Sequence, residues 1–272
     1  LFVFDTNSDE FVETVSTLGT LLYGIAVDSQ GNVFIAQTDA RNDVNGRAGT
    51  KKHGLKELEN RPFLNRITSV KWNSASGSDV KSKPNVSWIE LEPVPPKQPQ
   101  RDAAQATPYA IQVSQDDRYL YVTAAGSDAF SILDATDGKL LGRCDVGAVP
   151  QGISIEYREG KPVNAWVLNA AENSVALVDI QVPSQPRFLQ SIPLDDPTDA
   201  VIKRGRIAFT TAKASTTGTF SCASCHPDGH TDQLLWVLAT PIVTGGNQIM
   251  PRSTMPVRGL RDTAPQIGRA HV

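Results

Sequence analysis

Two cysteines and a histidine near the end of the chain form a short motif with a recognisable chemistry. Cys222 and Cys225 are separated by two residues, and His226 follows directly. This C-x-x-C-H spacing is that of covalent c-type haem attachment. Two thiols add to the two vinyl groups of one haem, so both sulfurs must reach one side of the ring, and the next residue then lies under the iron as its proximal ligand. The sequence therefore predicts one covalently bound haem c.

Other uses of the cysteine pair remain open at this point. A thioredoxin-like redox pair needs a βαβ context, which the surrounding residues do not predict. A zinc site needs four ligands, and His230 could add one, but no second C-x-x-C follows. A disulfide between two such close cysteines is the third alternative.

The far side of the iron has two candidate ligands, Met250 and Met255, the only methionines in the chain. A thioether ligand stabilises reduced haem and suits electron transfer. Either methionine could instead pack against the porphyrin, and an open position would favour peroxide or small-ligand chemistry. Arg252, Arg258 and Arg261 are candidates for the haem propionates, because arginine binds carboxylates through two parallel hydrogen bonds.

Other side chains near the motif have expected roles in its surroundings. Phe220 and Trp236 are expected to shield the ring from water, which lets the protein tune its potential. His230 cannot easily reach the far face of the same haem and is expected at the haem edge or at the surface. His53 is expected in a surface loop, and Cys144 is expected to be a small buried apolar side chain.

The residues ahead of the motif read as a repeat of short strands separated by turns. One copy begins at Pro108 and the next at Pro150, 42 residues later. This offset matches a four-stranded β-propeller blade of about 40–45 residues. A β-sandwich is also built from short strands, but it does not explain the repeat. We therefore expect a mainly β chain that begins with a partial propeller.

The domain organisation follows from this repeat. Residues 1–196 are predicted to form a partial β-propeller with a long polar insertion near 38–65. Strand alternation fades near Pro197, and residues 197–266 are predicted to form a small, truncated, α-helical cytochrome c-like haem domain. The last six residues, 267–272, match the translation of a common sequencing adapter, so the natural sequence is expected to stop at about Gln266.

Two resemblances refine these expectations. The blade pattern, with Tyr-Val-Thr at 121–123, resembles the YVTN family of bacterial seven-bladed propellers over roughly residues 1–196. The residues around the haem motif resemble the first haem domain of the bacterial di-haem cytochrome c peroxidase family over about 203–266. The matching positions are Gly205, Arg206, Phe209, Ser215, Gly218, Thr219, Ser221, Thr231, Asp232 and the Arg252–Leu260 segment.

The second resemblance is incomplete. Residues 233–251 contain no histidine for the distal side, and no second haem domain is present. The chain would then be a fragment of a longer protein, and two-haem peroxidase activity is in doubt.

The composition limits the partners. The net charge of -3 does not suggest a nucleic-acid binder, and no apolar run approaches the roughly 18 residues that cross a bilayer. Covalent haem attachment takes place outside the cytoplasmic membrane, so we expect an exported protein of the bacterial periplasm or cell surface.

The main functional expectation is haem-mediated electron transfer to a redox partner protein or from a small-molecule reductant, with the propeller as a docking or binding module. The alternatives are a peroxidase-like enzyme and a scaffold with a redox-sensing haem.

Overall fold

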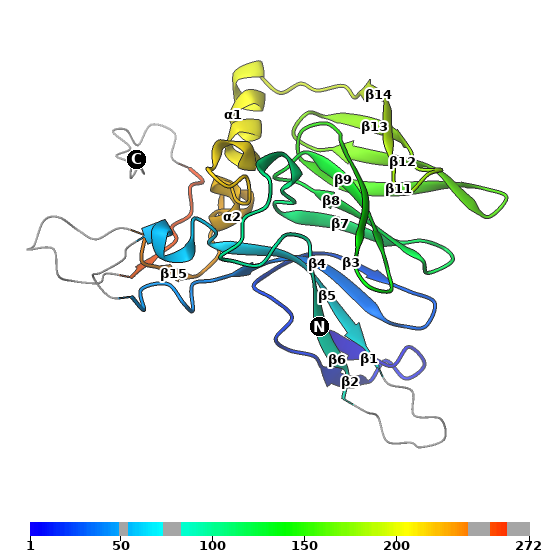
Figure 1. The fold of residues 1–272 in the computed structure, drawn as a ribbon, viewed down its shortest axis with the longest axis horizontal. Helices are drawn as coiled ribbons and strands as arrows, with labels where there is room; N and C mark the ends of the chain where they lie inside the picture. Colours follow the sequence, from blue (N-terminus) through cyan, green and yellow to red (C-terminus); the bar gives the residue numbers. More distant parts are fainter. Residues whose placement is uncertain (49–53, 73–82, 239–250, 260–272) are drawn as a thin grey trace, which may run out of the picture.

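The computed structural model describes residues 1–48, 54–72, 83–238 and 251–259, and it is mainly β (Figure 1). Three four-stranded antiparallel sheets stand side by side, and the strands of each sheet follow one another along the chain. The first sheet contains β3 (Leu21–Val27), β4 (Val33–Ala40), β5 (Phe63–Lys71) and β6 (Asn85–Glu90). The second contains β7 (Pro108–Val113), β8 (Tyr119–Ala124), β9 (Ala129–Asp134) and β10 (Leu140–Asp145). The third contains β11 (Pro150–Arg158), β12 (Lys161–Asn169), β13 (Ser174–Asp179) and β14 (Arg187–Pro193).

The three sheets are arranged like blades of a β-propeller. The first strands β3, β7 and β11 contact one another in turn, so the sheets spread outward from a common line. The predicted repeat is confirmed, because Pro108 opens β7 and Pro150 opens β11. Left-handed turn residues such as Asp117 (φ 58°) and Gly138 (φ 75°) reverse the chain between strands of the second sheet.

Two hydrophobic cores fill the spaces between neighbouring sheets. Leu120 on β8 is buried in the core between the first and second sheets, with Phe34 and Ile67. Tyr121, the next residue, is buried in the core between the second and third sheets, with Phe130. Successive residues of a strand point to opposite faces, so β8 stabilises both junctions at once. A short ribbon of β1 (Phe2–Phe4) and β2 (Phe11–Thr14) precedes the first sheet.

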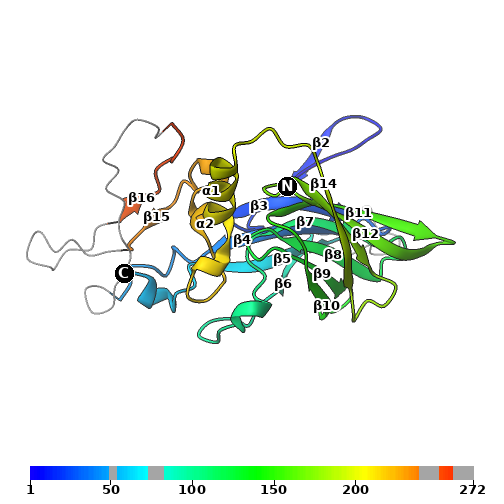
Figure 2. The same ribbon diagram turned by 90° about the horizontal axis from the view of Figure 1, so that it is seen from above.

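The residues after the third sheet lie across one end of the blades, where the helices α1 (Ala200–Thr210) and α2 (Cys222–Cys225) contact each other (Figure 2). The Asp199 side chain caps α1 by accepting the N–H of Val201 at 2.8 Å. A two-stranded ribbon of β15 (Leu235–Trp236) and β16 (Arg252–Ser253) follows. None of the helices in the described ranges is long and apolar enough to cross a bilayer.

The expected small α-helical cytochrome domain is wrong. The described part of 197–266 contains one helix of 11 residues and one of four, and no side chain of α1 is fully buried. A helical domain needs several helices that bury apolar faces against one another. Here the segment packs on the first sheet instead, where Trp236 is buried with Leu58 and Phe63.

The connection between β4 and β5 supplies that packing surface. A 3-10 turn at Gly54–Leu58 places the Leu58 side chain in the core below Trp236. Gly54 has a left-handed φ of 64° and lies against the carbonyl group of Leu238, so a larger residue would collide there. Part of the segment predicted to be a polar insertion therefore packs against the residues that follow α2. His53 lies outside the described residues.

Candidate functional site

The C-x-x-C-H motif occupies a single helical turn. Cys222 and Cys225 are the first and last residues of α2, and residues three apart in a helix lie on the same side. The turn is fixed locally, because the N–H of Ser221 donates to the Ser224 hydroxyl at 3.0 Å and the N–H of His226 donates to the Cys222 carbonyl at 3.0 Å. Both cysteines are free thiols, and Cys222 is exposed.

The His226 ring is held by a backbone group. Its Nδ1 atom lies 3.3 Å from the carbonyl oxygen of His230. A proton on Nδ1 donates to that carbonyl, which leaves Nε2 free as a ligand. The Phe209 ring of α1 lies 6.4 Å from the imidazole, measured between ring centroids. His230 thus contributes its backbone to the site, and its own side chain is exposed.

A cavity of 620 Å³ opens beside the motif, and both cysteines and His226 line it. This volume is in the range of sites for small molecules and cofactors. The apolar part of the lining comes from α1, from the ribbon and from the β4–β5 connection: Leu55, Pro62, Phe209, Phe220, Trp236, Leu238 and Val257. The residues therefore fit a large, mostly apolar group attached to two thiols. Sequence reasoning missed Leu55 and Pro62, although they are apolar residues within a polar stretch.

One wall of the cavity is tied to both the motif and the first sheet. The indole N–H of Trp236 donates to the Asp232 carboxylate at 2.9 Å, and the N–H of Asp232 donates to the Cys225 carbonyl at 3.0 Å. The Trp236 ring packs edge-on against Phe63, with 5.4 Å between centroids. The aromatic wall is thereby fixed next to Cys225.

Most of the other predicted site residues that the structure describes lie at this cavity. Arg252, at the start of β16, is exposed and lines it, as does Met255, whose side chain is 73% exposed. Arg258 instead donates from Nε to the Asp228 carbonyl at 2.7 Å and faces a second cleft. Met250 and Arg261 lie outside the described residues.

The state of the thiols bears on the alternative uses of the motif. Burial, together with the nearby Asp232 and Cys222, raises the pKa of Cys225 to about 12. The Cys225 thiol is therefore protonated at neutral pH. Within the described ranges, no group of three His, Cys, Asp or Glu side chains is placed to hold a metal ion, so no zinc site of that composition is formed there.

A buried polar network holds the residues ahead of the motif against the sheets. The Asn65 side-chain amide donates to the Thr219 carbonyl and to the Glu92 carboxylate, both at 3.1 Å, and its oxygen accepts the N–H of Thr107 at 3.0 Å. Glu92 also pairs with Arg61 at 2.7 Å, and both side chains are only 1% exposed. Their burial raises the pKa of Glu92 and lowers the pKa of Arg61.

No protein-family model matches the chain, and no curated protein matches it. Among solved structures, Kuenenia stuttgartiensis hydrazine synthase is 17% identical with a TM-score of 0.47, over 65% of this chain and 50% of that one. A chain of a nidogen/laminin complex is 13% identical with a TM-score of 0.42, over 71% and 55%. A functionally unknown protein from Desulfotomaculum acetoxidans DSM 771 is 14% identical with a TM-score of 0.40, over 70% and 47%. The alignments span about half the length of those chains.

The family expectations from the sequence are wrong, because the described part of the chain is mainly β, with two α-helices, and forms no cytochrome domain. The residues that suggested the second family have other positions here, because Gly205, Arg206 and Phe209 lie on a single helix with no buried side chain. Thr219 is bound to Asn65 of the first sheet rather than to a helical haem domain.

Proposed function

We propose that the chain carries one covalently attached haem c at Cys222 and Cys225 and transfers single electrons. The observation that carries this proposal is the juxtaposition of a one-turn C-x-x-C-H segment with a largely apolar cavity of 620 Å³. When bound, haem supplies reversible one-electron chemistry at its iron.

The residues of the cavity have separate tasks in this proposal. His226, held through Nδ1, presents Nε2 as the proximal ligand. Phe220 and Trp236 keep water from the ring, and Arg252 at the rim pairs with a propionate. Met255 lines the same cavity, and its thioether would be a second ligand of the iron.

The cellular setting of the proposal follows from the attachment chemistry. Covalent haem is added outside the cytoplasmic membrane, so the proposal includes export to the bacterial periplasm or cell surface. The sheets then present the haem segment to a redox partner protein or a small-molecule reductant. The anchoring of this segment on the first sheet through Asn65 and Trp236 supports that arrangement.

Electron transfer is tested by redox titration of the whole chain made in a host with c-type haem maturation. We expect a single reversible one-electron transition. The His226→Ala variant should lose the normal proximal coordination and shift the spectrum, whereas His230→Ala, which keeps the backbone carbonyl, should not. Irreversible oxidation, or equal spectra for wild type and His226→Ala, would contradict the proposal.

A further inference from the structure

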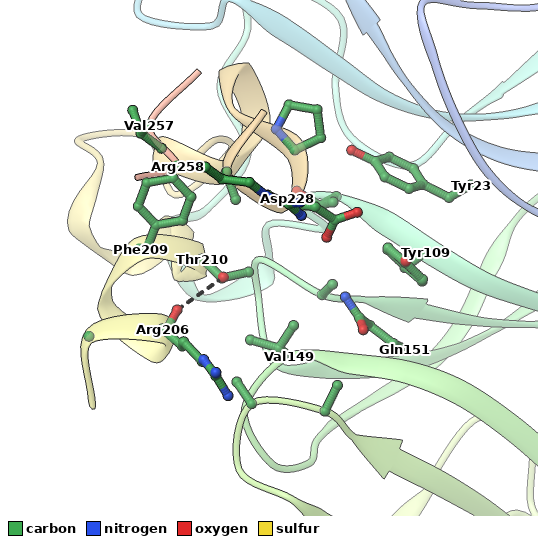
Figure 3. Close-up of a pocket in the computed structure, with 18 residues that line it drawn as sticks. Tyr23, Tyr109, Val149, Gln151, Arg206, Phe209, Thr210, Asp228, Val257 and Arg258 are labelled. Carbon is green, nitrogen blue, oxygen red and sulfur yellow. Dashed lines mark hydrogen bonds between the residues drawn. The ribbon is translucent and has the colours of Figure 1, made fainter. Parts of the chain in front are cut away.

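A second cavity of 590 Å³ lies between the haem-motif segment and the sheets (Figure 3). Ala223 and Pro227 of the motif region line it, and Phe209 and Val257 border both this cleft and the first cavity. The cleft is therefore a separate space on the other side of a shared apolar wall. The charged and polar residues of the cleft have no part in the proposed attachment of haem, and neither cysteine of the motif lines it.

The wall formed by the sheets is uncharged and comes from equivalent positions of the repeat. Tyr23, Tyr109 and Gln151 lie on β3, β7 and β11, the strands that meet along the common line of the three sheets. The rings of Tyr23 and Tyr109 are 4.9 Å apart between centroids. Equivalent polar side chains from three consecutive repeats thus line the same cleft.

The opposite wall carries all of the charged groups. Arg206 comes from α1, Asp228 follows the haem motif, and Arg258 follows β16. Arg206 and Asp228 are both exposed, and in the described parts of the chain neither the guanidinium nor the carboxylate makes a hydrogen bond or salt bridge. Asp228 adopts a left-handed φ of 52°, and its carboxylate points toward Tyr23 and Gln151 in Figure 3. Unpaired groups of both signs therefore face one cleft.

The electrostatics agree with this placement. The pKa of Tyr23 is raised to about 12, mainly by burial; a hydrogen bond with Thr38 opposes the shift, and Tyr109 and Asp228 contribute to it. Burial and then Asp228 also raise the pKa of Tyr109. Both phenols are therefore neutral and can donate or accept hydrogen bonds at neutral pH. The carboxylate of Asp228 is close enough to influence both rings.

We infer that this cleft binds a small aminocarboxylate of the amino-acid class. Its carboxylate would pair with Arg206, assisted by Arg258, and its ammonium group would pair with Asp228. The neutral body would lie against the Tyr109 ring and the apolar side chains around Phe209 and Val149. A purely anionic ligand would leave Asp228 unpaired, and a purely cationic one would face two arginines, so a ligand with both charges fits best.

The test is a thermal-shift screen of the twenty standard amino acids on the whole chain, followed by calorimetry. The tightest amino acid is compared with its des-amino acid and its decarboxylated amine. We expect saturable one-site binding, with both analogues weaker by roughly tenfold or more, since each lacks one charge-assisted contact.

Matched variants locate the site. Arg206→Gln and Asp228→Asn should each weaken binding by roughly tenfold or more. Arg204→Gln, on the same helix but outside the cleft, and Asp195→Asn, at an exposed position, should bind like the wild type. Equal affinity of either analogue, or no effect of the two cleft variants, would overturn the inference, as would the absence of binding by every amino acid.

The inference does not depend on haem. The calorimetry is therefore repeated on the double variant Cys222→Ser/Cys225→Ser, which cannot attach the cofactor. We expect binding there to stay within about twofold of the wild-type value. In the wild type, absence of haem with retained binding would contradict only the proposed electron transfer, whereas covalent haem without amino-acid binding would contradict only this site.

Discussion

The three cysteines of the chain differ in solvent exposure. Cys222 opens the α2 turn and is exposed, whereas Cys144 is half-buried against the core between the second and third sheets. Burial, assisted by Asp145 and opposed by Arg143, raises the pKa of Cys144 to about 12. Because the thiolate is the reactive form, Cys144 should be inert at neutral pH. The expectation that it is a small apolar side chain agrees with its packing.

Alkylation of the haem-free chain checks this difference. At pH 8, iodoacetamide should modify Cys222 well before Cys144, with the modified residue identified by peptide mass spectrometry. The Cys222→Ser variant is the control, and its Cys144 should stay unmodified on the same time scale. Equal reaction rates of Cys144 and Cys222 would contradict the description of Cys144 as buried and protonated.

Whether Met255 is the second ligand of the iron can be tested by changing its side chain alone. Replacing Met255 with leucine keeps the apolar volume and removes the sulfur. If Met255 binds the iron, the loss of a thioether that stabilises reduced haem should lower the reduction potential. A potentiometric titration measures the change. An unchanged potential would exclude Met255 and leave Met250 or an open sixth position.

At the scale of elements, the position of the motif depends on contacts between segments far apart in the chain. Asn65 on β5 bridges Glu92, Thr107 and Thr219, and Thr219 lies three residues ahead of Cys222. Each of these groups is buried, so each needs its partner. The network therefore connects two sheets to the segment that contains the C-x-x-C-H motif.

Asn65→Ala should destabilise the fold, since it removes the partner of the buried backbone groups of Thr107 and Thr219 and one donor to Glu92, which keeps Arg61. We expect a loss of about 2–3 kcal/mol in the free energy of unfolding, measured by urea titration. Asn7→Ala, at an exposed turn, should change it by less than about 0.5 kcal/mol. A loss as small as that of the control would show that the network does not hold the segment.

The strands could be predicted from the sequence better than the segment around the motif. Strands of the repeat are marked by alternation and turn residues, which are local signals. The positions of residues 197–238 and 251–259 depend on the contact of Trp236 with Leu58 and Phe63, which no local sequence pattern predicts. The cleft had a signal that was missed, since Tyr23, Tyr109 and Gln151 are equivalent polar residues in three first strands.

At the scale of the whole molecule, the first and third sheets expose apolar side chains to solvent. Leu22, Ile25 and Val27 of β3 are exposed, and so are Phe188, Leu189 and Ile192 of β14. Contiguous apolar patches and open sheet edges favour association. These exposed apolar surfaces could also pack against a further sheet added next to the first or the third sheet.

We therefore expect this chain to self-associate at micromolar concentrations. The double variant Ile25→Lys/Phe188→Lys should shift the sedimentation coefficient toward the monomer, because it places a charge on each outer face. Leu140→Lys, an exposed position on the middle sheet, is the control and should leave the association unchanged. A wild-type chain that sediments as a monomer at all concentrations would contradict this expectation.

The central claim is that Cys222 and Cys225 attach one haem, and intact-mass spectrometry of the denatured chain tests it most directly. The chain is produced in a host with c-type haem maturation, beside Cys144→Ser and Cys222→Ser/Cys225→Ser. We predict a mass increase of one haem in the wild type and in Cys144→Ser, and none in the double variant. A wild-type chain whose mass shows no haem, although another c-type protein matures in the same host, would contradict the account.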